Sequence, residues 1–77
     1  MGKKNEHITA EGVIAQALGY ENFRVTLDNG VELLATVSGR LRLHRIRLMT
    51  GDRVKVEISP YDLTRGRIVY RFNAARR

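Results

Sequence analysis

The chain has 77 residues, a formal net charge of +6 and no cysteine. This length predicts one small domain, and so small a domain rarely forms a deep enzyme cleft. The lack of cysteine excludes disulfides, cysteine zinc sites and thiol nucleophiles, and it fits a cytoplasmic protein held together by its apolar core. No apolar run approaches the ~20 residues of a membrane-spanning helix.

The charge is divided unevenly between the two halves of the chain. Residues 1–38 hold three cations and five acids, a net charge of −2, whereas residues 39–77 hold eleven cations and three acids, a net charge of +8. Across the chain, arginines outnumber lysines by eleven to three. Because a guanidinium binds phosphate oxygens better than an ammonium does, the second half is predicted to face a polyanion.

The first half predicts a meander of three strands, over residues 8–18, 23–27 and 31–37. The second strand alternates most clearly, with Phe23 on its inner face. Gly12 stands inside the first strand, where glycine usually marks a bulge or sharp bend, and Ile14 and Leu18 are expected to share one face. Asn29-Gly30 predicts a hairpin turn, since both residues tolerate positive φ.

The pattern is ambiguous after the third strand, which ends at Ser38-Gly39. The alternation of arginine and leucine that follows fails at His44, and helical spacing fits only part of the segment. We expect a connector over residues 40–49 that forms a short helix or turn, with Ile46 and Leu48 anchoring its end.

Two more strands are predicted, over residues 53–58 and 67–72. The segment between them, residues 59–66, contains the only proline and is expected to form a loop. Tyr70 and Phe72 of the last strand are candidates for the core.

This order of elements predicts an all-β fold: a five-stranded OB-fold barrel with a short helix or turn between the third and fourth strands. An SH3-like barrel is the alternative. A single OB-fold (S1-like) domain is expected over residues 8–72. A flexible leader at residues 1–7 is expected to precede it, and a basic tail at residues 73–77 to follow it.

The sequence contains no recognisable catalytic or metal-binding constellation. Its two histidines lie far apart, its acids are scattered, and it has no phosphate-binding loop. Ser38 and Ser59 stand at expected turns, and Asp52 is expected to cap a turn. We therefore expect a protein that is not an enzyme and that uses no metal or cofactor.

The arginines form two clusters that favour nucleic-acid binding over a merely solvated surface. The connector cluster consists of Arg40, Arg42, Arg45 and Arg47. The strand cluster consists of Arg65, Arg67 and Arg71. Tyr61 lies in the loop before the strand cluster, and two roles are open for it: stacking on a base, or anchoring the loop on the barrel.

Several motifs together resemble bacterial translation initiation factor one, over roughly residues 8–71. In the second half they are Ser38-Gly39-Arg40-Leu41-Arg42, Ile46-Arg47-Leu48, Thr50-Gly51-Asp52-Arg53-Val54 and Pro60-Tyr61-Asp62-Leu63-Thr64-Arg65-Gly66-Arg67-Ile68-Val69. In the first half they are Gly12, Phe23-Arg24-Val25 and Leu27-Asp28-Asn29-Gly30.

The resemblance implies an OB-fold protein that occupies the decoding A site of the small ribosomal subunit. Such a protein contacts ribosomal RNA and a neighbouring ribosomal protein, cooperates with initiation factors two and three, and keeps elongator tRNA from binding prematurely. We expect it to be a monomer when free. The family's RNA-facing residues carry over to Arg40, Arg42, Arg47, Tyr61, Arg65, Arg67 and Arg71.

The chain departs from the family pattern at two connector positions. Arg45 stands where the family commonly has tyrosine, and Leu43 stands where it commonly has a basic or polar residue. The hypothesis that this chain is a divergent second copy of the factor therefore also stays open. Two other functions compete with the resemblance: a cold-shock type binder of single-stranded RNA or DNA, and a basic protein-interaction adaptor.

Overall fold

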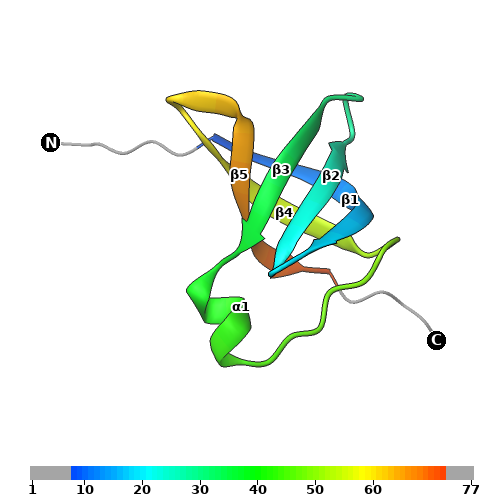
Figure 1. Ribbon diagram of the computed structural model, residues 1–77. Helices are drawn as coiled ribbons and strands as arrows, with labels where there is room; N and C mark the ends of the chain where they lie inside the picture. The colour runs from blue at the N-terminus through cyan, green and yellow to red at the C-terminus, as the bar shows by residue number, and fades with distance from the viewer. Residues whose placement is uncertain (1–7, 73–77) are drawn as a thin grey trace, which may run out of the picture.

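Five strands and one short helix form the structure (Figure 1). The computed structural model describes residues 8–72, so the leader expected at residues 1–7 and the tail expected at residues 73–77 lie outside the described residues. The elements in chain order are β1 (Ile8–Gly19), β2 (Asn22–Leu27), β3 (Glu32–Val37), α1 (Gly39–Leu43), β4 (Arg53–Ser59) and β5 (Asp62–Arg71).

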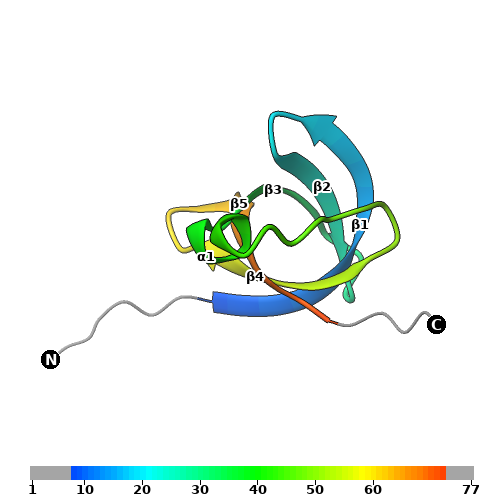
Figure 2. The same cartoon turned by 90° about the horizontal axis from the view of Figure 1, so that it is seen from below.

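The strands close into a barrel in the order β1-β2-β3-β5-β4. Short turns join the antiparallel pairs β1–β2, β2–β3 and β4–β5, while β3 pairs with β5 in parallel and β1 pairs back to β4. Figure 2 shows α1 lying across one end of this barrel, beside β5. The closed five-stranded barrel and the position of its helix confirm the predicted OB-fold.

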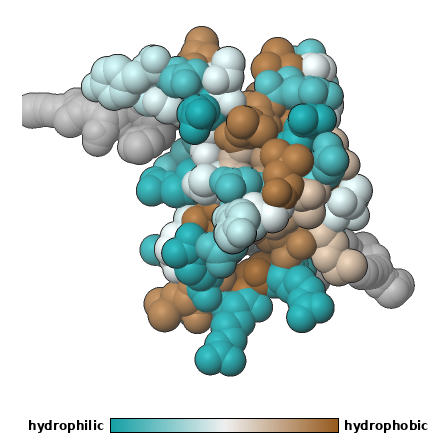
Figure 3. All heavy atoms as spheres, viewed as in Figure 1, coloured by the Kyte–Doolittle hydropathy of each residue, from teal (hydrophilic) through white to brown (hydrophobic). Residues whose placement is uncertain are grey.

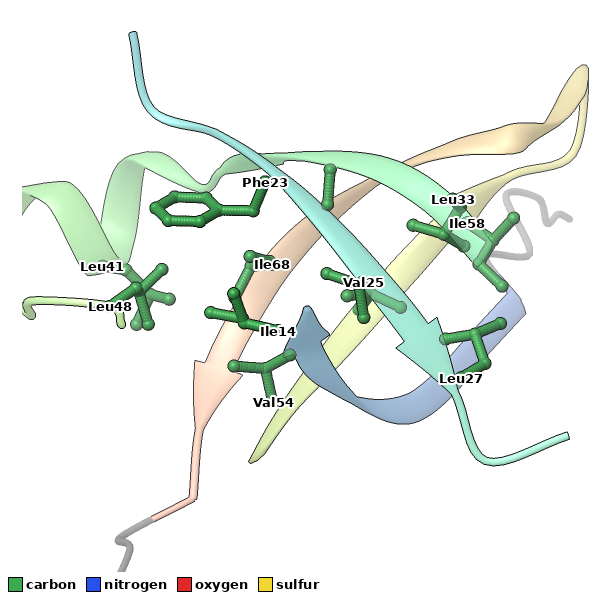
Figure 4. Close-up of a cluster of buried hydrophobic side chains, with 12 residues drawn as sticks. Ile14, Phe23, Val25, Leu27, Leu33, Leu41, Leu48, Val54, Ile58 and Ile68 are labelled. Carbon is green, nitrogen blue, oxygen red and sulfur yellow. The ribbon is translucent and has the colours of Figure 1, made fainter. Parts of the chain in front are cut away.

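Alternate residues of every strand fill the barrel interior (Figure 4). The buried strand residues are Ile14, Phe23, Val25, Leu27, Leu33, Ala35, Val54, Val56, Ile58 and Ile68. Leu41 of α1 and Leu48 of the connector close the end of the core next to Phe23, and Ile46 packs against them. The expected inward position of Phe23 and the anchoring of the connector by Ile46 and Leu48 are therefore confirmed.

Gly12 lies where β1 passes between two neighbours, paired with Leu27 of β2 and with Val54 of β4. A Cβ atom here would lie 2.8 Å from the Cα of Leu27 and still closer to the carbonyl oxygen of Thr26. The glycine is thus required by close backbone approach rather than by a bulge. The shifts in register of β1 come later, the first of them between Ile14 and Gln16.

That shift overturns one expectation for β1. It ends the simple alternation, so Leu18 is 39% exposed while Ile14 is fully buried. The expected loop over residues 59–66 is wrong as well. β5 begins at Asp62, and only Pro60 and Tyr61 form the turn.

A bulge in β5 overturns a third expectation. Lys55 and Val56 of β4 pair with Tyr70 and Ile68, which leaves Val69 without a partner on β4. An extra residue reverses the direction of the side chains that follow it. Tyr70 is therefore 52% exposed, and Phe72 is only partly buried, so neither joins the buried core.

Among residues 8–72 there is no helix with the length and apolar character needed to cross a membrane.

Candidate nucleic-acid interface

The short helix α1 turns the first two connector arginines outward. Ser38 caps the helix, since its Oγ accepts a hydrogen bond from the backbone N–H of Leu41 at 3.3 Å. The side chain of Leu41 is buried in the core, which leaves Arg40 and Arg42 exposed on the two flanks of the helix.

Arg45 follows His44, the residue that caps the C-terminal end of α1. Its φ of 56° is left-handed, a conformation that glycine usually supplies at this position. The N–H of Arg45 donates to the carbonyl of Arg42, and the N–H of Ile46 donates to the carbonyl of Leu41, which is the Schellman pattern. Arg45 therefore has a backbone role, which the sequence conceals because arginine is not a typical residue for it.

The strand cluster divides into two parts. Arg65 and Arg67 lie exposed on the outer face of β5, opposite Leu34 and Thr36 of β3. Arg71 follows the bulge and pairs in register with buried Val54, so it is turned toward the end of the barrel.

There the guanidinium of Arg71 donates a hydrogen bond to the carbonyl oxygen of Arg47 at 2.8 Å. Arg71 thus lies apart from the outer face of Arg65 and Arg67. It fastens the end of β5 to the connector and supports the segment that carries Arg47.

Two hollows that share Arg67 join the strand cluster to Arg40 of the connector cluster, and a third hollow lies at the connector itself. Arg67 and Arg40 line the same hollow, next to Ser38. Arg67 also borders a second hollow along the β4–β5 hairpin, with Arg65 and Tyr61. We call the surface that runs from Tyr61 along β5 to the connector the arginine band.

The third hollow lies at the connector end of the arginine band. Its apolar lining includes Phe23 and Ile46, and its charged lining is Arg42, Arg45, Arg47 and Glu21. Figure 3 shows hydrophilic side chains interspersed with a few apolar ones on the face over β5 and α1.

Tyr61 is 95% exposed at the tip of the β4–β5 turn. Its backbone N–H donates to Ser59 Oγ at 3.1 Å, so the serine holds the turn and the ring is left in solvent. Of the two roles open for Tyr61, this geometry excludes anchoring of the loop on the barrel. The ring is therefore available for stacking on a base. The turn roles expected of the polar side chains are confirmed, since Asp52 likewise accepts a hydrogen bond from the N–H of Met49 at 2.9 Å.

Carboxylates accompany three arginines of the band. Arg42 lies 2.7 Å from Glu21, Arg67 lies 2.7 Å from Glu57, and Arg65 lies 3.6 Å from Asp62. Within residues 8–72, no carboxylate lies at ion-pair distance from Arg40, Arg45 or Arg47. The band therefore keeps a positive surplus that is greatest at the connector.

A separate ion cluster lies outside the arginine band. Arg53, at the start of β4, contacts Asp28 at 2.6 Å and Glu11 at 3.3 Å. The hydrogen bonds from Arg53 hold the pKa of Asp28 below its usual value. This cluster joins three parts of the barrel wall and pairs Glu11 and Asp28 with an arginine outside the band.

Two further exposed residues were not singled out from the sequence, and one of them, Arg24, lines a hollow together with Arg65 of the arginine band. Arg24 lies outward on β2, beside Leu34, which in turn pairs with Arg65. Arg24 was missed because the charge was summed over the two halves of the chain, and Arg24 lies in the half whose net charge is negative. Tyr20, in the β1–β2 turn, is 98% exposed and has a φ of 52°.

No three His, Cys, Asp or Glu side chains of the described segment are grouped as metal ligands would be.

A small closed barrel with an arginine-rich face defines a class of protein, the OB-fold nucleic-acid binders. Comparison with known families narrows this class. The chain matches the family "Translation initiation factor 1A / IF-1" over residues 2–76 and belongs to that family, which confirms the resemblance inferred from the motifs.

Two solved structures are similar to the barrel. The solution structure of translation initiation factor one from the Wolbachia endosymbiont strain TRS of Brugia malayi is 42% identical, with a TM-score of 0.73, and the match covers 87% of this chain and 79% of that one. The crystal structure of YjeQ from Thermotoga maritima is 21% identical, with a TM-score of 0.69, and the match covers 86% of this chain and 23% of that one. The second likeness shows the fold alone.

Proposed function

We propose that this translation initiation factor binds the small ribosomal subunit at the decoding A site, with the arginine band against ribosomal RNA. The observation that carries this proposal is the arginine band, which follows the β4–β5 hairpin, α1 and the connector. Six arginines and the exposed ring of Tyr61 lie along it.

The mechanism is binding without chemistry. Guanidinium groups neutralise RNA phosphates, and the barrel fills the site by its shape, because folded RNA is recognised largely through backbone and shape. Tyr61 stacks on an unpaired base, and Arg71 contributes by holding the connector in place. The phosphate contacts come from Arg40, Arg42, Arg45, Arg47, Arg65 and Arg67.

The same proposal extends to the partners of the complex. A factor seated in the A site blocks premature binding of elongator tRNA and acts together with initiation factors two and three. It lies beside a ribosomal protein there. We propose that it works in the cytoplasm, as a monomer when free, and without catalytic activity.

The test is titration of purified small ribosomal subunits with the labelled protein at several salt concentrations. If about five phosphates are neutralised, the logarithm of the affinity falls with the logarithm of salt at a slope of roughly −3 to −4. Arg67→Ala and Arg42→Ala each weaken binding by roughly three- to tenfold, which corresponds to one lost charge-assisted contact. Chemical footprinting of the ribosomal RNA is expected to show that the protein protects nucleotides of the decoding site.

Lys55→Gln serves as the control, because it also removes one positive charge but lies on β4 outside the arginine band. Equal effects of Lys55→Gln and Arg67→Ala, or an affinity that does not depend on salt, would contradict the proposed surface. Binding that persists after the subunits are digested with nuclease would favour the protein-interaction adaptor.

The structure does not favour the cold-shock type of single-strand binder. The outer faces of β2 and β3 carry no aromatic residue, whereas that mode of binding needs aromatic rings on which successive bases stack.

A further inference from the structure

The β1–β2 turn brings an acid to the arginine band. Tyr20 and Glu21 connect β1 to β2, and both have positive φ, 52° and 63°. Turns of this kind usually contain Asn-Gly, because most side chains disfavour positive φ. The backbone of the turn therefore gives no reason for a glutamate at position 21.

The side chain of Glu21 gives such a reason. Its Oε1 lies 2.7 Å from Nη2 of Arg42, and the two side chains are 51% and 57% exposed. The pair lies at the rim of the hollow that Arg45 and Arg47 also line. Glu21 is the only acid among the residues described in this lining, which it shares with three arginines.

A carboxylate and a phosphate offer an arginine the same kind of acceptor, two oxygens in the plane of the guanidinium. While Glu21 lies at ion-pair distance, it partly neutralises the charge of Arg42 and competes with a phosphate for that guanidinium. Because the pair is half exposed, solvent and salt screen it, and it has only the modest strength of an exposed ion pair. Such a pair can be exchanged for another partner without unfolding any part of the barrel.

We propose that Glu21 is an internal competitor of RNA phosphate for Arg42. This inference rests on the proposed function, since it assumes that the arginine band meets RNA. In the free protein the carboxylate holds the guanidinium; in the complex a phosphate replaces it. Glu21 thereby lowers the affinity for the small subunit and speeds release.

The test compares Glu21→Gln with Glu11→Gln in titrations of purified small ribosomal subunits. Both variants remove one negative charge, and each removes the acid of an exposed ion pair with arginine. Glu11 pairs with Arg53 outside the band, so it controls for net charge and for the loss of an ion pair. Thermal unfolding checks that both variants remain folded.

Glu21→Gln is expected to bind about two- to fivefold more tightly than Glu11→Gln, with the difference in the dissociation rate. In an Arg42→Gln background the difference between the two glutamate variants disappears, because the guanidinium for which Glu21 and phosphate compete is absent. Either equal affinities of the two single variants or weaker binding by Glu21→Gln overturns the proposal.

The failure of this inference can be told apart from the failure of the proposed function. If Arg42→Gln weakens binding while the two glutamate variants behave alike, the band binds RNA and Glu21 does not compete. If Arg42→Gln itself binds as the wild type does, then the proposed surface is wrong, and the inference falls with it.

Discussion

Replacing Gly12 by alanine tests the packing that closes the barrel. The added Cβ would lie 2.8 Å from the Cα of Leu27 and closer still to the carbonyl oxygen of Thr26. Both atoms belong to the backbone of β2, so no change of rotamer can relieve the contact. β1 cannot simply move away either, because Gly12 is also paired with Val54 of β4.

The expected loss of stability follows from these contacts. Overpacking costs about 1–3 kcal/mol, and the backbone contacts place this site at the upper end of the range. Alanine also lowers the entropy of the unfolded chain, which raises the free energy of unfolding by about 0.4–1 kcal/mol and offsets part of this loss. The net destabilisation is about 2 kcal/mol, which is a large part of the stability of a domain this small and lowers its Tm by roughly 10 °C.

Urea unfolding followed by circular dichroism measures this difference. Gly39→Ala is the matched control, because nothing lies within 4 Å of its added Cβ and the site is the first residue of α1. Alanine at a helical position stabilises by about 0.5–1 kcal/mol relative to glycine. If Gly12→Ala unfolds within about 0.5 kcal/mol of the wild type, the close approach of β1 and β2 is not as described.

Three further predictions concern single side chains. Ser38→Ala removes the cap of α1 and lowers the free energy of unfolding by about 1 kcal/mol, whereas Ser38→Thr retains most of it; equal loss in both would contradict the capping role. Asp28→Asn destabilises at neutral pH because Arg53 loses the nearer of its two carboxylate partners. Since the contact with Arg53 lowers the pKa of Asp28 in the folded state, the stabilisation is present above about pH 4 and is lost as the pH falls further. Urea titrations at pH 6 and pH 2.5 should therefore show the variant and the wild type converging in acid, and a difference that does not change with pH would refute this. Tyr20→Asn stabilises by about 0.5–1 kcal/mol, because asparagine tolerates positive φ better than tyrosine; a less stable variant would show that the ring of Tyr20 has a structural contact.

Short-range sequence patterns predicted the strand faces and the anchors of the connector, because neighbouring residues determine both. The alternation of Phe23, Val25 and Leu27 gives their burial directly, since neighbouring strand residues face opposite sides. Ile46 and Leu48 could be predicted to anchor the connector because they are apolar residues among arginines. Charge counting selected Arg40, Arg65 and Arg67, which the fold places around two adjoining hollows.

What the sequence could not predict depends on pairing between distant segments. The direction of Arg71 is set by the unpaired Val69, and that bulge exists only in the register of β4 with β5. The contact of Glu21 with Arg42 joins a turn and a helix that the sequence separates by a hairpin. In Arg45, the tertiary fold overrides the preference of arginine against positive φ.

The way in which β5 fits into the barrel has a consequence for folding kinetics. β1, β2 and β3 can pair through short turns, but β4 must return to β1, and β5 must insert beside β3, over long stretches of chain. Such distant pairings impose a large entropy cost before they gain contacts, which predicts slow and cooperative folding. Arg40 and Arg67 become neighbours only when β5 docks, so a partly folded chain does not present the arginine band. Binding of the band should therefore select fully folded molecules and protect them against unfolding.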